Sequence, residues 1–463
     1  MSLIIILASL ALLMFVAYRG FSVILFAPVC ALLAVLFTDP SLVPPMFSGI
    51  FMEKMVGFVK LYFPVFLLGA VFGKMIEISG FSKSIVSSVI KLVGRERSIL
   101  SIVLVCAILT YGGVSLFVVV FAVYPFAAEM FKQSDIPKRL IPGTIALGAF
   151  TFTMDSLPGT PQIQNIIPTT FFKTDTWAAP WLGVIGSIVI LTAGLAYLGW
   201  RRRVAAAAGE GYGTGHSNEP EPFAEEKLPS FWLALTPLVL VGVMNKVFTV
   251  LIPQFYGASH SATVVGMAKP LVTDVSKIAA IWAVEAALFL GIMTVLLFAF
   301  KQVKAKFTEG SKAAVAGSLL ASMNTATEYG FGAIIAALPG FTVIADALKM
   351  IPNPLINEAI TVTALAGVTG SASGGMSIAL AAMSETFINA ANAAHIPLEV
   401  FHRVASMASG GMDTLPHNGA VITLLAVTGL THKTSYKDIF AVTLIKTAAV
   451  FVVIAVYYLT GIY

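Results

Sequence analysis

The chain has 463 residues, of which 58% are apolar and only 11% are charged, and its mean hydropathy is +0.91. Soluble globular proteins carry about 25% charged residues, so a chain with so few charges cannot cover a water-facing surface of this size. The composition therefore excludes a soluble enzyme, a secreted disulfide scaffold and a nucleic-acid-binding protein. We predict an all-α polytopic membrane protein.

The net charge of +5 does not indicate a nucleic-acid partner, because the lysines and arginines are scattered over short loops. Their placement instead predicts which side of the membrane each loop faces. Both cysteines, Cys30 and Cys106, lie inside apolar runs, which favours buried thiols over a disulfide. The N-terminus lacks the basic segment of a cleavable signal peptide, so we expect residues 2–18 to remain as a membrane span.

Apolar stretches that match the ~20 residues needed to cross a bilayer recur along the chain. We predict full spans at 2–18, 21–37, 61–79, 177–200, 231–252, 276–300, 313–338 and 438–461. Two further spans, 140–172 and 403–431, are broken near their middle. Two segments, 99–130 and 354–392, have a Gly/Ser/Thr cluster at the centre and polar residues at both ends. We predict that these two segments enter the membrane and return as hairpins.

The placement of basic residues favours re-entry. If the N-terminus is outside and both hairpins return to the side they entered, most of the 28 lysines and arginines fall in cytoplasmic segments. The long outer segment 253–275 then holds only Lys269. A full crossing at either hairpin would place the next basic cluster on the wrong side. We therefore expect both termini to be extracytoplasmic.

Residues 201–230 are predicted to be a cytoplasmic linker between two halves, 1–200 and 231–463. The stretch 204–226 is rich in Gly, Glu and Pro and poor in bulky apolar side chains, which predicts a flexible segment.

The two halves resemble each other. Four motifs recur in the same order about 260 residues apart: Gly-Phe at 80 and 340, Gly-Gly-x-Ser at 112 and 374, Ile-Pro at 136 and 396, and Met-Asp-[Ser/Thr]-Leu-Pro at 154 and 412. Each half has five crossings and one hairpin, so the second half begins on the opposite side of the membrane. The pattern predicts an inverted-topology repeat, which is typical of secondary transporters.

Four interruptions fall at membrane depth, in two matched pairs. The hairpin tips are 110–115 and 369–377, and the breaks in the long spans are 155–161 and 413–419. Irregular backbone inside a bilayer persists only where it lines a cavity, because its amides and carbonyls need polar partners. Freed N–H groups favour an anion and freed carbonyls favour a cation. We therefore expect the four interruptions to meet around a polar site.

Asp155 and Asp413 are the strongest candidates in this site. A charge at mid-bilayer costs about 2.5–3.5 kcal/mol on insertion scales, so each aspartate needs a partner or a function. Each could cap the half-helix that follows it, a role compatible with Na⁺ coordination or proton transfer. Ser156 and Thr160 are the further coupling candidates, with Na⁺ at Asp155 and Asp413 as the metal that the site could hold.

Small and polar residues at the interruptions are the candidate substrate contacts. They are Gly112, Gly113, Ser115, Gly374, Gly375, Ser377, Thr414, His417 and Asn418. His417 has no counterpart in the first half, where Gly159 stands, and it fits a structural hydrogen bond, a substrate contact or a proton relay. Gln162, Asn165 and Glu328 are further polar candidates. No ATP-binding loop and no Cys/His metal cluster is present in the sequence, and no cofactor is expected.

At its breaks and tips the chain resembles the gluconate permease (GntP) family of the ion transporter superfamily. The resemblance covers nearly the whole length and rests on Gly-Gly-Val-Ser (112–115), Met-Asp-Ser-Leu-Pro-Gly-Thr-Pro-Gln (154–162) and Met-Asp-Thr-Leu-Pro-His-Asn-Gly (412–419). The region 155–168 is most similar to members named as 3-hydroxybutyrate permeases.

The resemblance implies cation-coupled uptake of small carboxylates across a bacterial inner membrane. It also implies a homodimer with a fixed scaffold and an elevator-like moving domain that contains both hairpins. Relatives that carry dicarboxylates have Ser-Asn-Thr at each tip. The Gly-Gly-Val-Ser and Gly-Gly-Met-Ser sequences here depart from that pattern.

We therefore expect a secondary active symporter, driven by H⁺ or Na⁺, for a small hydroxylated monocarboxylate such as 3-hydroxybutyrate. Gluconate or another sugar acid is the alternative substrate. Since neither tip contains Lys or Arg, backbone N–H groups and hydroxyls would hold the carboxylate. Two other classes stay open: a passive channel, and an intramembrane hydrolase that uses a serine, an aspartate and His417.

Overall fold

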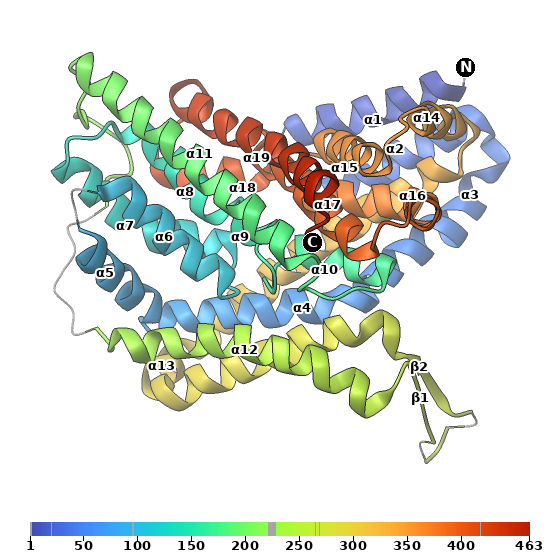
Figure 1. Ribbon diagram of the computed structural model, residues 1–463, viewed down its shortest axis with the longest axis horizontal. Coiled ribbons are helices and arrows are strands. Elements are labelled where there is room, and N and C mark those ends of the chain that lie inside the picture. The colour runs from blue at the N-terminus through green and yellow to red at the C-terminus, as the bar shows by residue number, and fades with distance from the viewer. Residues whose placement is uncertain are drawn as a thin grey trace.

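The computed structural model consists almost entirely of helices (Figure 1). It describes residues 2–19, 21–94, 97–220, 228–263, 265–267, 269–416 and 418–463. The helices of the first half are α1 (Ser2–Tyr18), α2 (Val23–Thr38), α3 (Val43–Met46), α4 (Met52–Ile78), α5 (Phe81–Val93), α6 (Ser98–Tyr111), α7 (Leu116–Gln133), α8 (Ile141–Ala149), α9 (Phe152–Asp155), α10 (Ile163–Phe172) and α11 (Pro180–Ala207).

The second half follows with α12 (Phe231–Tyr256), α13 (Val275–Ala337), α14 (Pro339–Lys349), α15 (Pro354–Thr369), α16 (Ala372–Ala394), α17 (Leu398–Gly410), α18 (Gly419–Thr428) and α19 (His432–Thr460). Short turns of 3-10 or π helix precede α3, α4 and α8 and follow α17. The fold is that of an all-α polytopic membrane protein, as the composition predicts.

Five helical segments in the described part of the chain are long and apolar enough to cross a bilayer: Pro40–Ile78, α11, α12, α13 and α19. Their outer faces carry large apolar side chains that lipid can cover. Trp232, Phe255 and Leu297, for example, are each at least 70% exposed.

Helix α13 joins two spans that the sequence predicts as separate helices. It runs through 63 residues and bends at Ala299, where φ −129° and ψ 31° leave the helical range. The expected loop at 301–312 contains four lysines and no proline. Because lysine is a good helix former and tolerates water, the helix continues through this polar stretch.

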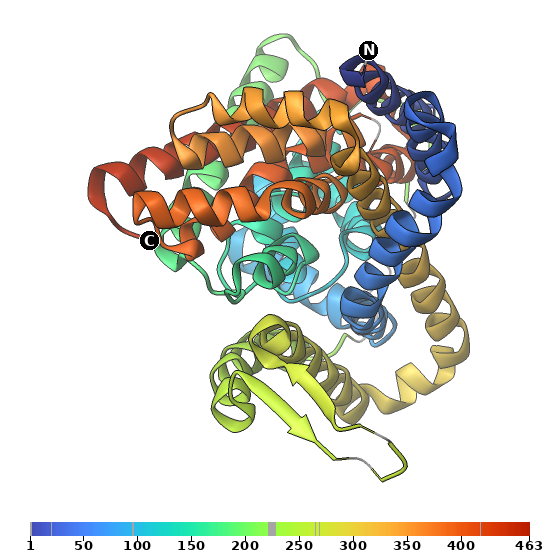
Figure 2. The ribbon, with the colours of Figure 1, turned by 90° about the vertical axis from the view of Figure 1, so that its right-hand side faces the viewer.

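A small antiparallel sheet is the one non-helical element among the described residues. Strands β1 (Ser259–Ala262) and β2 (Leu271–Asp274) pair with Ser259 opposite Asp274. The sequence analysis expected only an outer connection over 253–275. The hairpin of strands projects from the ends of α12 and α13 (Figures 1 and 2).

Both segments that the sequence predicts as hairpins fold as pairs of helices that pack against each other. Helices α6 and α7 form the first hairpin, and α15 and α16 form the second. Helix α6 has 14 residues and α15 has 16. At 1.5 Å per residue, about 21–24 Å, neither spans the ~30 Å hydrocarbon core.

Both broken spans are interrupted where the sequence predicts. The first consists of α8, the single turn α9 and α10, and the second of α17, a 3-10 turn over Gly411–Thr414 and α18. The half-helices have between 9 and 13 residues. The polypeptide between the half-helices is therefore irregular in the middle of each span.

The helices form two layers. Helices α1, α2, α4, α12 and α13 pack on one another in what we call the scaffold layer. The two hairpins, the two broken spans, α11 and α19 pack together in what we call the inner bundle. Figure 2 shows the yellow-green α12 and the start of α13 set apart from the orange and red helices of the inner bundle.

The predicted linker is ordered over part of its length. Residues 208–220 lie against the inner bundle, and we call this segment the strap. The Glu219 carboxylate is 2.7 Å from Lys138 Nζ, and Arg139 makes two 2.7 Å hydrogen bonds to Glu210. Tyr212 is buried and its N–H donates to Asp135. The expectation of a flexible segment therefore fails for the strap, because these long-range contacts fix it.

The strap contacts predict a defined pH dependence. Hydrogen bonds from Arg139 lower the pKa of Glu210 from its ordinary 4.5. A lowered pKa means that this contact stabilises the strap at pH values above 4.5 and is lost as the pH falls below that value. We expect Glu210→Gln to speed amide hydrogen exchange across 208–220 at neutral pH, and acidification of the wild type to lower the protection of these amides relative to their intrinsic exchange rates at the same pH. Glu309→Gln on α13 is the control, and equal exchange in both variants would contradict the assignment.

Candidate functional site

The first break is built around a buried ion pair. Asp155, at the end of α9, is fully buried, and one of its carboxylate oxygens lies 2.6 Å from the Nζ of Lys446 on α19. The other oxygen accepts a 2.7 Å hydrogen bond from Ser156. Lys446 also donates to the carbonyl of Phe150 at 2.8 Å, where α8 ends. Lys446 thus stabilises both the acid and the interrupted backbone.

The second break uses its aspartate differently. Asp413 accepts a 2.9 Å hydrogen bond from the backbone N–H of Ala372, the first residue of α16. Its other oxygen accepts from Gln164 Nε2 at 2.7 Å, and Asn418 lies 3.5 Å away. Asp413 therefore caps the helix that leaves the second hairpin tip. Because Gln164 belongs to α10, this contact also joins the two breaks.

Each break contacts the hairpin of its own half in the same way. Gln162 directly precedes α10, and its side-chain amide donates to the carbonyl of Thr110 at 2.7 Å. Asn418 directly precedes α18, and its side-chain amide donates to the carbonyl of Gly370 at 2.7 Å. Thr110 and Gly370 both lie where the first helix of a hairpin ends. The four interruptions therefore form one connected polar site.

Side chains of α17, in the second half of the chain, hold the first break in place by hydrogen bonds. Arg403 is fully buried and donates to the carbonyls of Asp155 and Ala178 and to the Oδ1 of Asn165, at 2.8–3.2 Å. Ser406 also donates to the Asp155 carbonyl, at 2.9 Å. Side chains from one half thus satisfy carbonyls that the break in the other half frees.

Glu328, on α13 of the scaffold layer, lies at the site. Its carboxylate is buried against the start of α16, so close to Gly374 that a Cβ there would come within 1.6 Å of the Oε2. Thr325, one turn earlier on α13, lies 3.3 Å from the hydroxyl of Ser373. The second hairpin tip is therefore in direct contact with α13.

The candidate glycines of the first tip face the scaffold layer. A Cβ on Gly112 would come within 2.5 Å of Leu238 on α12. Gly113 has φ +95°, a left-handed conformation that favours glycine, and lies against Pro161 and Leu288. Ser115 begins α7 and is half-buried. These residues shape the tip and dock it on α12 and α13.

The remaining candidates divide between packing and polar contacts. Gly375 allows close packing within the second hairpin, since its Cβ would come within 2.0 Å of Ala366. The Ser377 hydroxyl donates to the Ser373 carbonyl, and that of Thr414 bonds to Gly411 and Thr443. Thr160 donates to the Thr153 carbonyl and closes the first break. His417 lies outside the described residues.

Among the described residues, no group of three or more His, Cys, Asp or Glu side chains is placed to hold a metal ion.

Comparison with known proteins places the chain among transporters. No protein-family model matches it. YxjC of Bacillus subtilis (strain 168), described as an uncharacterized transporter, is 62% identical over 470 residues, covering 100% of both chains. The chain belongs to the YxjC family. The crystal structure of the Alcanivorax borkumensis YdaH transporter matches 89% of this chain and 88% of its own, with 13% identity and a TM-score of 0.49. A likeness at that level carries no argument about function.

Several buried ionisable residues of this YxjC-family chain are not among the candidates that the sequence predicts. They include Lys446, Arg403, His402 and Glu358, each at most 1% exposed. Lys446 is a lone charge inside the apolar run of the last span, a signal that could have identified it. Both carboxylate oxygens of Glu358, on α15, lack a hydrogen-bond partner among the described residues. Arg403 stands near the start of the second broken span, where basic residues also mark membrane boundaries.

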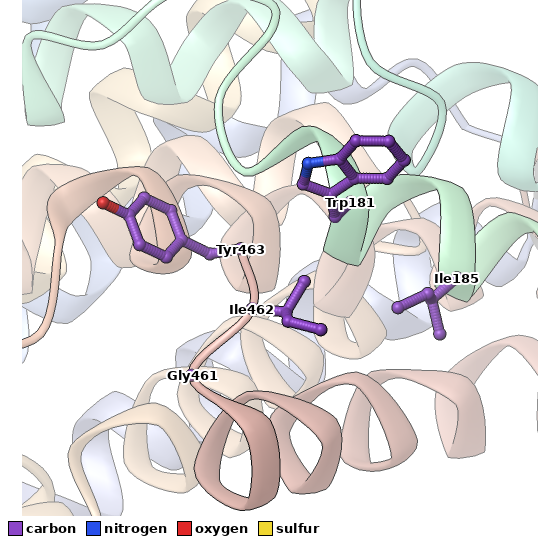
Figure 3. Close-up of a pocket in the computed structure, with 5 residues that line it drawn as sticks. All are labelled: Trp181, Ile185, Gly461, Ile462 and Tyr463. Carbon is purple, nitrogen blue, oxygen red and sulfur yellow. The ribbon is translucent and has the colours of Figure 1, made fainter.

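Two cavities among the described residues lie away from this site. One of about 400 Å³ lies between Trp181 and Ile185 on α11 and the C-terminal residues Gly461–Tyr463 (Figure 3). Another, of about 230 Å³, lies between α4, α10 and α13 and is lined by Lys54, Tyr62 and Tyr329 among others. None of the candidate residues lines either cavity, and Asp155 and Asp413 are closed off from solvent.

Loss of Arg403 should destabilise the YxjC-family fold. Arg403→Met removes the hydrogen bonds to the carbonyls of Asp155 and Ala178 and to Asn165, and we expect a destabilisation of about 3 kcal/mol or more. The apparent melting temperature in detergent and the yield of monodisperse protein measure this loss. Arg203→Met, at an exposed position on α11, is the control. Equal melting temperatures for the two variants would show that Arg403 does not hold the first break.

Proposed function

We propose that this YxjC-family chain is a cation-coupled symporter for a small hydroxylated monocarboxylate. The observation that carries the proposal is the meeting of two helix breaks and two hairpin tips around Asp155 and Asp413. Half-helix ends at membrane depth offer N–H groups to an anion and carbonyls to a cation. A buried, fully enclosed site of this kind suits a carrier better than an open channel. A carrier holds its substrate away from the aqueous solution on both sides of the membrane.

The chemistry of the site favours a monoanion with hydroxyl groups. Hydroxyl and amide side chains surround the breaks, and the described tips carry no lysine or arginine to hold a phosphate. Among C4–C6 acids, 3-hydroxybutyrate is the leading substrate, by resemblance to the permeases with a similar sequence at 155–168. Gluconate and other sugar acids are the alternative.

The proposed setting follows the predicted topology. The protein would lie in the inner membrane of a bacterium, with both termini outside the cell, and would work as a homodimer. The scaffold layer would stay fixed while the inner bundle moves in an elevator-like step. Polar contacts across this boundary, such as the hydrogen bond from Asn245 on α12 to the Gly159 carbonyl, would then have to break and reform.

Uptake into proteoliposomes tests the proposal. Radiolabelled C4–C6 hydroxy acids are offered with either a pH gradient or a Na⁺ gradient. We expect wild-type protein to accumulate at least one of them against its concentration gradient. Asp155→Asn and Asp413→Asn should each abolish accumulation, because neither amide can take up a proton or balance a cation.

Asp274→Asn, at an exposed outer position, is the matched control and should transport like the wild type. Counterflow separates a carrier from a channel, since a channel cannot drive uphill exchange. Full accumulation by both aspartate variants would contradict their role in coupling.

A further inference from the structure

Lys446 is placed unlike any other basic residue of the inner bundle. It lies in the middle of α19, is 1% exposed, and lies 2.6 Å from Asp155. Its ammonium has three N–H donors, and the described residues supply two acceptors, Asp155 and the Phe150 carbonyl. Lys446 also attracts the Asp413 carboxylate electrostatically. With two acceptors for three donors, the ammonium keeps one N–H without an acceptor among the described residues.

The fold makes room for this pair. A Cβ on Gly410, at the end of α17, would come within 1.8 Å of the Asp155 carboxylate and 2.6 Å of Lys446 Nζ. The last turn of α17 therefore lies directly against both charges. Since only glycine leaves that space, a side chain at position 410 would displace the pair.

Charge balance limits what can bind beside the pair. Asp155 and Lys446 neutralise each other, while Asp413 is held by neutral donors and Glu328 contributes a further carboxyl group. Arg403 bears the other nearby positive charge, but four of its five N–H groups donate to carbonyls and Asn165. His402 beside it bonds to Thr174 and Asn165. A bare substrate carboxylate would therefore add an uncompensated charge to a buried site, which is strongly unfavourable.

A proton on Asp155 removes this obstacle. Protonation neutralises the acid and leaves the Lys446 ammonium to pair with an incoming carboxylate. Na⁺ cannot serve at the same place, because the ammonium already occupies the cation position 2.6 Å from the carboxylate oxygen. The charged groups that face the pair are Asp413 from the second break and Arg403 from α17, and both would keep their present partners.

We propose that Lys446 is the residue that binds the substrate's carboxylate, and that a proton taken up by Asp155 releases it to do so. This proposal rests on the proposed function and makes it more specific. One proton binds Asp155 as one monocarboxylate binds Lys446, so each cycle carries both across the membrane without net charge. No covalent bond other than the O–H of Asp155 forms or breaks.

The test uses full-length protein in sealed proteoliposomes, with 3-hydroxybutyrate as the probe, or the acid of the C4–C6 panel that the wild type accumulates best. Lys446→Met leaves a buried acid without its cation and should lose uptake. The double variant Asp155→Asn/Lys446→Met replaces the pair with neutral side chains of similar size, which preserves folding better than either single change.

For the double variant we expect counterflow to persist with KM raised about tenfold or more, the loss expected when a charged hydrogen bond is removed. A pH gradient should no longer drive accumulation by this variant. Lys437→Met, at an exposed position on the same helix, should keep the wild-type KM and pH dependence. A double variant with unchanged KM and unchanged pH-driven accumulation would show that the pair is only structural.

A second measurement needs no variant and so does not depend on folding. A pH-sensitive dye trapped inside wild-type vesicles should report internal acidification when the acid enters as its anion with a proton, in the absence of Na⁺. Uptake that needs Na⁺ and moves no proton would overturn the inference while leaving the symporter proposal standing. Failure of the wild type to transport any acid of the panel would instead overturn the proposed function itself.

Discussion

The structure depends on one constraint: a backbone polar group inside a bilayer must find a partner within the protein. The first break leaves a series of carbonyls outside any helix. They are satisfied by donors from five helices, since Lys446, Arg403, Tyr111, Asn245 and Asn165 bond to the carbonyls of residues 150, 155, 158, 159 and 160 respectively. An interruption that looks local in sequence is therefore held by the whole inner bundle and part of the scaffold layer.

The same constraint explains where the charges lie. A lysine, an arginine and two aspartates are buried at the breaks because irregular backbone supplies the donors and acceptors that they need. Asp155 is matched by an ammonium, whereas Asp413 is matched by a helix N-terminus and two amides. The two halves thus share a backbone plan but differ in charge, which is what a site for an acid and its driving cation requires.

The sequence predicts the hairpins and breaks because their signals are local: apolar length, Gly/Ser/Thr clusters and proline. It cannot predict that Lys446 meets Asp155, since the partners belong to opposite halves and no local pattern joins them. The strap has the composition of a flexible linker, yet Lys138 and Arg139 order it from a distant segment. Helix α13 continues past Ala299 through a stretch rich in lysine. The charge of these lysines predicts the end of a membrane span, whereas their high helix propensity allows the helix to continue.

Cross-linking the two breaks tests the central claim most directly. Gln164→Cys and Asp413→Cys are introduced together after Cys30 and Cys106 are replaced by serine, with a protease site inserted in 221–227. Because the native side chains meet at 2.7 Å, a short thiol-reactive cross-linker applied in the membrane should keep the two halves joined after cleavage. Gln164→Cys paired with Lys437→Cys should let them separate. Separation of the halves in the Gln164/Asp413 pair as well would show that the breaks do not meet, and would contradict this account.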